Sequence, residues 1–126
     1  MNDVIENDFR SSWIAMHEFF TDLVENYDGS QHVRPMLGLI AKFQSCGYDA
    51  RFRAGQSLHY LMISRSAKHG LDENDPSISF YSAGNEQFNL RYWESKRQLV
   101  EYDFELSDFE PTEDSSVQKL LDYQIH

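Results

Sequence analysis

The stretch from Val100 to Leu106 alternates strictly between apolar and acidic side chains. The apolar positions are Val100, Tyr102, Phe104 and Leu106, and the positions between them are Glu101, Asp103 and Glu105. A period of two predicts a β-strand that buries one face and exposes the other. The exposed face of this strand is then a row of three carboxylates, which we call the acidic row.

The segment before it predicts the other arm of a β-hairpin, with its apolar face at Phe88, Leu90 and Tyr92. A two-residue loop at Ser95–Lys96 would set Leu90 opposite Glu101, which mixes the apolar and acidic faces. A shift by one residue places Leu90 opposite Val100 or Tyr102, so we predict a loop of three or more residues at 95–97. One such register places Arg91 opposite Glu101, a favourable pair of opposite charges.

The N-terminal part of the chain is helical by its spacing. A stripe with steps of three and four residues predicts an amphipathic helix, made of Phe9, Trp13, Met16, Phe20, Leu23 and Tyr27. Asn7 or Asp8 can cap its start, and Asp28–Gly29 can end it. Pro35 suits the first turn of a second helix, which Gly47 can terminate.

Strands and a closing helix follow. Residues 58–63 are apolar apart from His59 and predict a central strand, with Gly55 marking a tight turn or a bulge before it. Residues 77–82 predict a further short strand, and a helix around Val117 is capped by Asp114 or Ser115. We expect a single α+β domain spanning residues 1–126, with two N-terminal helices, an antiparallel β-meander of about four strands and one short C-terminal helix.

Composition restricts the classes of partner. The formal net charge of −10 disfavours binding to nucleic acid or to anionic membranes, whose phosphates repel an acidic protein. No apolar run approaches the length of a membrane helix. The single cysteine, Cys46, cannot form an internal disulfide, and no signal peptide is visible. We expect a cytoplasmic protein in a reducing environment.

A search for catalytic motifs favours a protein that is not an enzyme. The pair His17–Glu18 begins like a zinc-protease motif, but Thr21 stands where the second histidine is needed. The acids in residues 72–75 lack the spacing of a calcium loop, and no histidines pair at metal-ligand spacing. We expect no cofactor and no metal site.

Basic residues gather in residues 50–71, a stretch without a single acid. In one interpretation this stretch is mainly buried strand, where an acid would be costly, and its cations lie at the strand ends. In the other, it forms a small-molecule or anion-binding site from Arg51, Arg53, Arg65 and His59, because arginine binds anions bidentately.

The leading hypothesis is a non-enzymatic protein-binding module. A basic protein could dock on the acidic row beside Trp93, since tryptophan is favoured at the centre of interfaces. In size and acidity the chain resembles bacterial immunity proteins, small α+β inhibitors of toxin domains, although no motif carries the resemblance. It implies an inhibitor-like partner of a basic protein. A homodimer through a sheet edge or a helix face is a third alternative.

Overall fold

The computed structural model describes residues 3–68 and 75–125 of the chain. Within this part, the elements in chain order are α1 (Asp3–Asn26), η1 (Gln31–Val33), α2 (Pro35–Ser45), η2 (Tyr48–Ala50), β1 (Arg53–Ser57), β2 (Tyr60–Ser64), β3 (Ser77–Gly84), β4 (Gln87–Glu94), β5 (Arg97–Glu105), η3 (Leu106–Asp108) and α3 (Ser115–Leu121).

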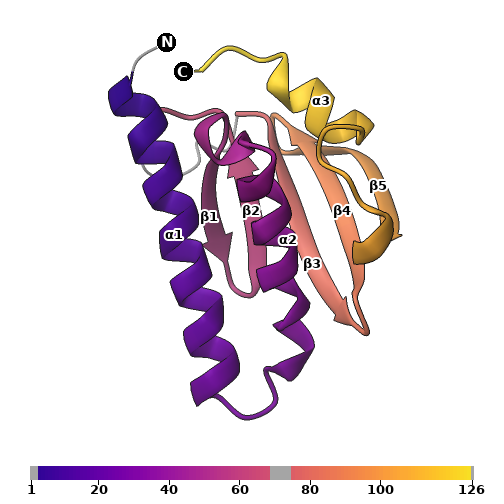
Figure 1. The fold of residues 1–126 in the computed structure, drawn as a ribbon. Helices are drawn as coiled ribbons and strands as arrows, with labels where there is room; N and C mark the ends of the chain where they lie inside the picture. The colour runs from indigo at the N-terminus through magenta and orange to yellow at the C-terminus, as the bar shows by residue number, and fades with distance from the viewer. Residues whose placement is uncertain (1–2, 69–74, 126) are drawn as a thin grey trace.

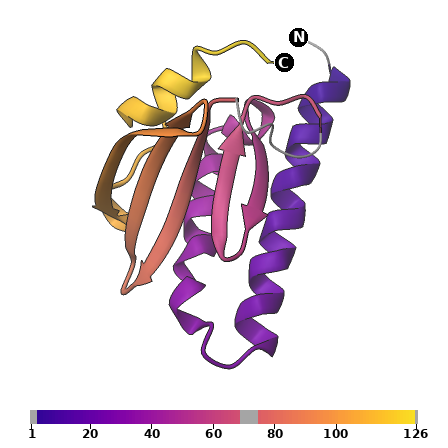
Figure 2. The ribbon, with the colours of Figure 1, turned by 180° about the vertical axis from the view of Figure 1, so that it is seen from behind.

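The described strands form one antiparallel sheet in the order β1-β2-β3-β4-β5, so each strand pairs with its neighbour in the chain. The three described helices lie against one face of this sheet, and the other face is open (Figures 1 and 2). The α+β class, the meander and the helix order are confirmed. The sheet has five strands where the sequence predicted about four, because residues 53–64 form two strands.

The hydrophobic core lies between the helices and the sheet. Trp13 of α1 stacks on Phe43 of α2 with 5.0 Å between ring centroids, and Phe43 meets Phe80 of β3 edge to face at 5.8 Å. The indole N–H of Trp13 donates to the carbonyl of Phe52 at 2.8 Å, which satisfies the polar atom of a fully buried ring. The aromatic residues of distant segments thus build one packed layer.

The predicted helix signals are mostly correct. Pro35 occupies the first turn of α2, and Gly47 after its end has a φ of 84°, a left-handed conformation that glycine adopts without strain. Asp114 caps α3 by accepting a 2.9 Å hydrogen bond from the backbone N–H of Val117. The predicted start of α1 at Asn7 or Asp8 is wrong, because the helix begins at Asp3.

The β1–β2 hairpin corrects the prediction for residues 50–63. The turn lies at Leu58–His59, with Leu58 at a φ of 55°, so His59 is an exposed turn residue outside the strand. Gly55 marks neither a turn nor a bulge, because it pairs with Met62 in a regular ladder. This turn brings Arg53 opposite Ser64, so the described residues on either side of the hairpin, 51–53 and 64–65, lie at the same end of it.

The β4–β5 hairpin has the predicted pairing but not the predicted loop. Leu90 lies opposite Tyr102 and Arg91 opposite Glu101, as the apolar faces require. The loop is a two-residue turn, Ser95–Lys96, with both residues at positive φ. A β-bulge between Tyr92 and Trp93 restores the register, because the partner strand carries one extra residue there.

Across the described ranges, none of the helices combines the length and the apolar character needed to cross a bilayer.

Candidate functional site

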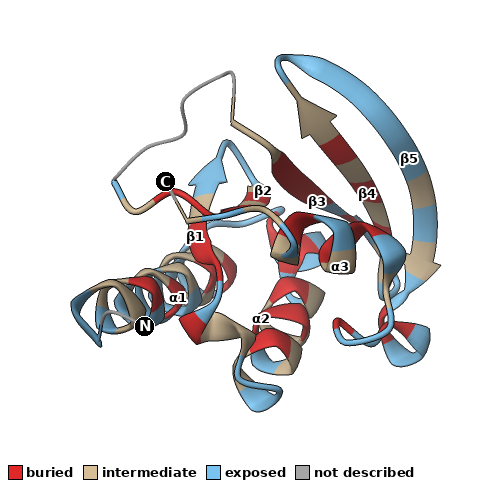
Figure 3. Cartoon of the chain, turned by 90° about the horizontal axis from the view of Figure 1, so that it is seen from above, coloured by how far each residue is buried: buried red, intermediate tan, exposed pale blue. Residues whose placement is uncertain are grey.

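The acidic row lies on the open face of the sheet. Its side chains alternate with Val100, Tyr102 and Phe104, which turn toward the helices, and all three acids are exposed. Figure 3 shows β5 as the outermost strand of the sheet and mostly exposed along its length. The three carboxylates therefore project from one exposed strand, about 6.8 Å apart along the chain.

Side chains of β4 hold the acidic row in place. The amide of Asn89 donates to Glu101 at 3.0 Å and to Asp103 at 2.9 Å, and the amide of Gln87 donates to Glu105 at 2.7 Å. Arg91 Nε lies 3.2 Å from Glu101 Oε2. The hydrogen bonds from Asn89 and then Arg91 lower the pKa of Glu101 below its ordinary 4.5. The row is thus oriented by hydrogen bonds before any partner arrives.

Trp93 lies on the same open face, near the turn end of β4. Its indole N–H donates to the hydroxyl of Ser79 on β3 at 3.1 Å, and the side chain is half-buried. Ser77 of β3 and Gln98 of β5 are its cross-strand partners, so the ring lies over the middle of the sheet. Trp93 and the acidic row therefore share one face, and part of the ring is accessible.

Arg53 is bound within the chain. Its guanidinium donates to the carbonyls of Ser66 and Ala67, each at 2.8 Å, and to the carboxylate of Asp8 at 2.5 Å. The same group lies over the ring of Phe9, 5.4 Å from its centroid. With 6% of its surface exposed, Arg53 connects α1 to the segment after β2.

Arg65 is also bound internally, and His59 lies elsewhere. Arg65 donates to the carbonyls of Tyr123 and Arg51 at 2.9 and 2.7 Å, and burial lowers its pKa. Arg51 is exposed at the same end of the hairpin, whereas His59 lies at the turn, with its ring 6.3 Å from that of His32. The structure brings the backbones of the three arginines to one end of the hairpin, but Arg53 and Arg65 bind different segments, and His59 lies at the other end. Residues 69–71 of the basic stretch lie outside the described residues.

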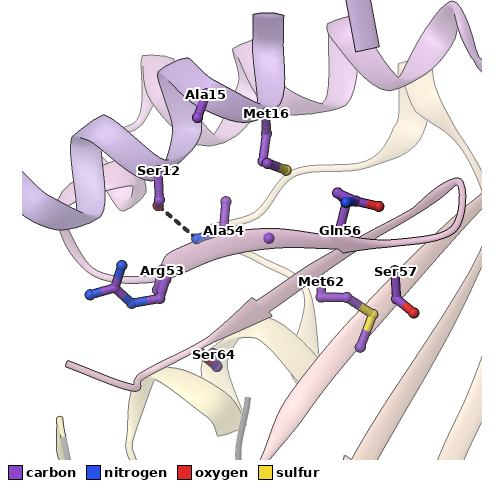
Figure 4. Close-up of a pocket in the computed structure, with 10 residues that line it drawn as sticks. Ser12, Ala15, Met16, Arg53, Ala54, Gln56, Ser57, Met62 and Ser64 are labelled. Carbon is purple, nitrogen blue, oxygen red and sulfur yellow. Dashed lines mark hydrogen bonds between the residues drawn. The ribbon is translucent and has the colours of Figure 1, made fainter. Parts of the chain in front are cut away.

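A cavity of about 510 Å³ opens between α1 and the edge of β1 (Figure 4). Its lining is mainly apolar, from Ala15, Met16, Ala54, Gly55 and Met62, with Ser12, Arg53, Gln56, Ser57 and Ser64 supplying polar groups. Ser12 Oγ accepts the backbone N–H of Ala54 at 2.9 Å, which fixes α1 against the strand. Sequence reasoning missed Ser12, Met16 and Met62 here, because helix and strand meet only in the folded chain.

A second cluster missed by sequence reasoning surrounds Glu94. Its carboxylate accepts hydrogen bonds from the hydroxyls of Tyr92 and Tyr123, and Lys119 Nζ lies 3.9 Å away. Burial raises the pKa of Tyr92, and the contact with Glu94 raises that of Tyr123. The cluster fastens the C-terminal segment to the sheet. No periodicity could have revealed it, since its members are far apart in the chain.

Groups for catalysis or metal binding were also sought. Within residues 3–68 and 75–125, no three His, Cys, Asp or Glu side chains are arranged to hold a metal ion. The Cys46 thiol contacts the carbonyl of Phe43 at 3.5 Å, and partial burial of the sulfur raises its pKa, although the residue as a whole is exposed. At neutral pH the side chain of Cys46 is therefore mainly the protonated thiol, which is a weaker nucleophile than the thiolate.

No protein-family model matches the chain, and searches of curated proteins and of solved structures also find no match.

Proposed function

We propose that the chain is a non-enzymatic protein-binding module whose partner is a basic protein. The observation that carries this proposal is the acidic row, held in place by Asn89, Gln87 and Arg91 on an exposed strand beside the accessible part of Trp93. A partner can place lysines or arginines on carboxylates that are already oriented. Preorganised groups lose little conformational entropy on binding, which favours affinity.

The net negative charge of the chain supports a basic protein as the partner. The net charge of −10 attracts a basic surface and speeds its encounter, while it repels nucleic acid and anionic lipid. The lowered pKa of Glu101 keeps that carboxylate ionised in mildly acidic conditions. An inhibitor of a basic protein, acting in the cytoplasm, fits these features and completes the proposal.

The test is capture of partners from a lysate of the source cells by three forms of the protein. The wild type is compared with a row variant (Glu101→Gln, Asp103→Asn, Glu105→Gln). It is also compared with a helix variant (Glu18→Gln, Asp22→Asn, Glu25→Gln), which removes as many exposed charges from α1. Because exposed ion pairs contribute about 0.2–1 kcal/mol each, loss of all three is expected to cost about 2 kcal/mol, which weakens binding of the partner roughly thirtyfold.

The result that supports the proposal is one basic protein retained by the wild type and the helix variant, lost by the row variant, and released by salt. Equal loss of the partner by both variants would show that capture depends on the net charge of the protein and not on the acidic row. Retention by the row variant would place the contact elsewhere and contradict the proposal.

The cavity beside β1 supports a second candidate function, the binding of a small molecule by the basic stretch. Seven of its ten lining residues come from residues 53–64. Its volume falls within the usual range for ligand pockets. Because the Arg53 guanidinium already binds Asp8 and two carbonyls, the cavity suits an uncharged, mainly apolar molecule better than an anion.

Gly55 provides the variant that tests this second candidate. A Cβ at Gly55 would have no neighbouring atom within 4 Å, so Gly55→Val places an apolar side chain in the open space of the cavity and reduces its volume. The wild type is expected to bind the apolar dye Nile red at one saturable site, and Gly55→Val to bind it at least tenfold more weakly. Ala83→Val on β3 is the control. Equal binding by all three proteins would exclude the cavity as a ligand site.

A further inference from the structure

The outer edge of β5 presents main-chain hydrogen-bonding groups. The backbone N–H of Leu106 donates to the carbonyl of Glu86 at 2.9 Å, which fixes the phase of the β4–β5 ladder. Because the pairs alternate along an antiparallel ladder, Phe104 and Tyr102 also direct their backbone groups to β4. The backbone N–H and C=O groups of the acidic row therefore point away from the sheet.

This edge is accessible along most of the strand. In the part of the chain that the structure describes, β5 is the last strand, and residues 97–101 are all exposed. Its contacts with the C-terminal segment come from core-facing side chains: Phe104 stacks on Phe109 at 4.2 Å, and the hydroxyl of Tyr102 donates to Asp114. These contacts lie under the sheet and leave the edge itself open (Figure 3).

The opposite edge of the sheet, strand β1, differs from β5 in its length and in how far it is covered. β1 has five residues, against nine in β5. Its outward N–H at Ala54 is already accepted by Ser12 Oγ of α1, which lies beside the strand (Figure 1). One edge is thus short and partly covered, whereas the other is long and uncovered. A long uncovered edge is a template for another strand unless charges prevent it.

The charges of the acidic row determine which kind of strand can pair with β5. A second copy of β5, paired antiparallel about Asp103, would set Asp103 opposite Asp103 and Glu101 opposite Glu105. Like charges directly opposite one another are destabilising, so self-pairing is disfavoured. A strand with lysine or arginine at these positions would instead meet a carboxylate at each. Arg91 already contacts Glu101, which leaves Asp103 and Glu105 as the main determinants.

We propose that the basic partner binds by adding an antiparallel strand to β5. The added segment alternates basic residues, on the open face against the acidic row, with apolar residues, which continue the layer of Val100, Tyr102 and Phe104. Main-chain hydrogen bonds supply affinity, and the alternation supplies specificity. This inference rests on the proposed function. It adds that the segment of the partner that binds there is an extended β-strand.

A matched set of peptides tests strand addition. The parent is a short synthetic peptide in which lysine alternates with valine. In one derivative the backbone nitrogens of the lysines are methylated, which removes their N–H donors. In the other derivative the backbone nitrogens of the valines are methylated instead. An antiparallel added strand turns the lysine N–H groups toward β5, because directly opposite residues share a hydrogen-bonded pair there. Affinities for the wild type and the row variant are measured by calorimetry.

The expected result is that lysine methylation weakens binding to the wild type at least tenfold, valine methylation changes it little, and the row variant binds the parent weakly. Two methylated peptides that bind as well as the parent would overturn strand addition, while the row-dependent ionic contact of the proposed function would stand. A parent peptide that binds both proteins equally would also overturn it. The proposed function is tested separately, and it fails if the row variant captures the basic partner as well as the wild type does.

Discussion

Arg53 illustrates at the scale of one residue how a cation in an acidic protein can serve the fold. Its guanidinium satisfies two carbonyls of the segment after β2 and a carboxylate of α1, and it is almost fully buried. The acid-free stretch thus supplies a donor to backbone groups that would otherwise be buried without partners. This agrees with the interpretation of the stretch as mainly buried strand only at its buried positions, where an acid would be costly, since residues 56–59 are exposed and Arg53 and Arg65 are themselves buried.

We expect Arg53→Met to lower the free energy of unfolding by about 2 kcal/mol, because a buried carbonyl and a partly buried one lose their donor while the packing of the stem is kept. Arg51→Met, at the exposed neighbouring position, is expected to change it by less than about 0.5 kcal/mol. Urea unfolding of both variants measures the difference. Equal effects would show that Arg53 is not a structural donor.

The Glu94 cluster should make stability depend on pH. The hydrogen bond from Tyr123 is the largest cause that lowers the pKa of Glu94 below its ordinary 4.5. Since the folded pKa is below the unfolded one, the carboxylate stabilises the fold above pH 4.5. That contribution disappears as the pH falls through the folded pKa.

Tyr123→Phe removes this hydrogen bond and keeps the ring. We expect the pKa of Glu94, followed by carbon-detected NMR of its carboxyl group, to rise toward its ordinary value. We also expect the acid unfolding seen by circular dichroism to begin at a higher pH than in the wild type. A pKa of Glu94 that is unchanged in Tyr123→Phe would contradict the assigned cause.

At the scale of elements, the β4–β5 hairpin shows what periodicity can and cannot predict. The register was predictable to within two alignments, because only those with Leu90 opposite Val100 or Tyr102 keep the apolar residues of both arms on one face, and the structure has the second. The loop was not, because the chain uses a two-residue turn and a bulge at Leu99 in place of a longer loop. A bulge depends on the local twist of two paired strands and left no sign in the composition.

The acidic row could be identified from the sequence because all its members lie on one strand. The ends of the basic stretch could not be placed, because their meeting depends on a turn at Leu58–His59 that has no glycine, proline or asparagine to announce it. The cavity and the Glu94 cluster join segments far apart in the chain. Such contacts follow from packing, and no local pattern encodes them.

The turn at Ser95–Lys96 offers a test at this scale. Both residues have positive φ, at 50° and 67°, which costs a non-glycine residue about 1 kcal/mol. We expect Lys96→Gly to raise the free energy of unfolding by up to about 1 kcal/mol. Ala41→Gly in α2, where glycine is unfavourable, is expected to lower it by a similar amount. A loss of stability in both variants would contradict the turn geometry.

At the scale of the whole molecule, the described sheet has one short, partly covered edge and one long, uncovered edge, and the chain has a net charge of −10. Carboxylates on an exposed edge strand protect it from pairing with copies of itself. The same arrangement admits a basic strand. In the proposed function, the residues that keep this edge from pairing with itself are therefore also the residues that bind the partner.

We expect the wild type to be monomeric at neutral pH, because two acidic edges repel. The row variant, whose edge is neutral, is expected to self-associate as its concentration rises. Sedimentation velocity at two concentrations measures both. A stable wild-type dimer that the row substitutions leave unchanged would show that another surface mediates association.

The central claim is that the acidic edge of β5 is the binding surface. Amide hydrogen exchange measured by NMR, for the free protein and with the lysine–valine peptide bound, tests it most directly. In the free protein the amides of Tyr102 and Phe104 should exchange slowly and those of the acidic row quickly. The peptide should slow the acidic row selectively. Row amides that exchange slowly without the peptide, or equally fast with it bound, would contradict the claim.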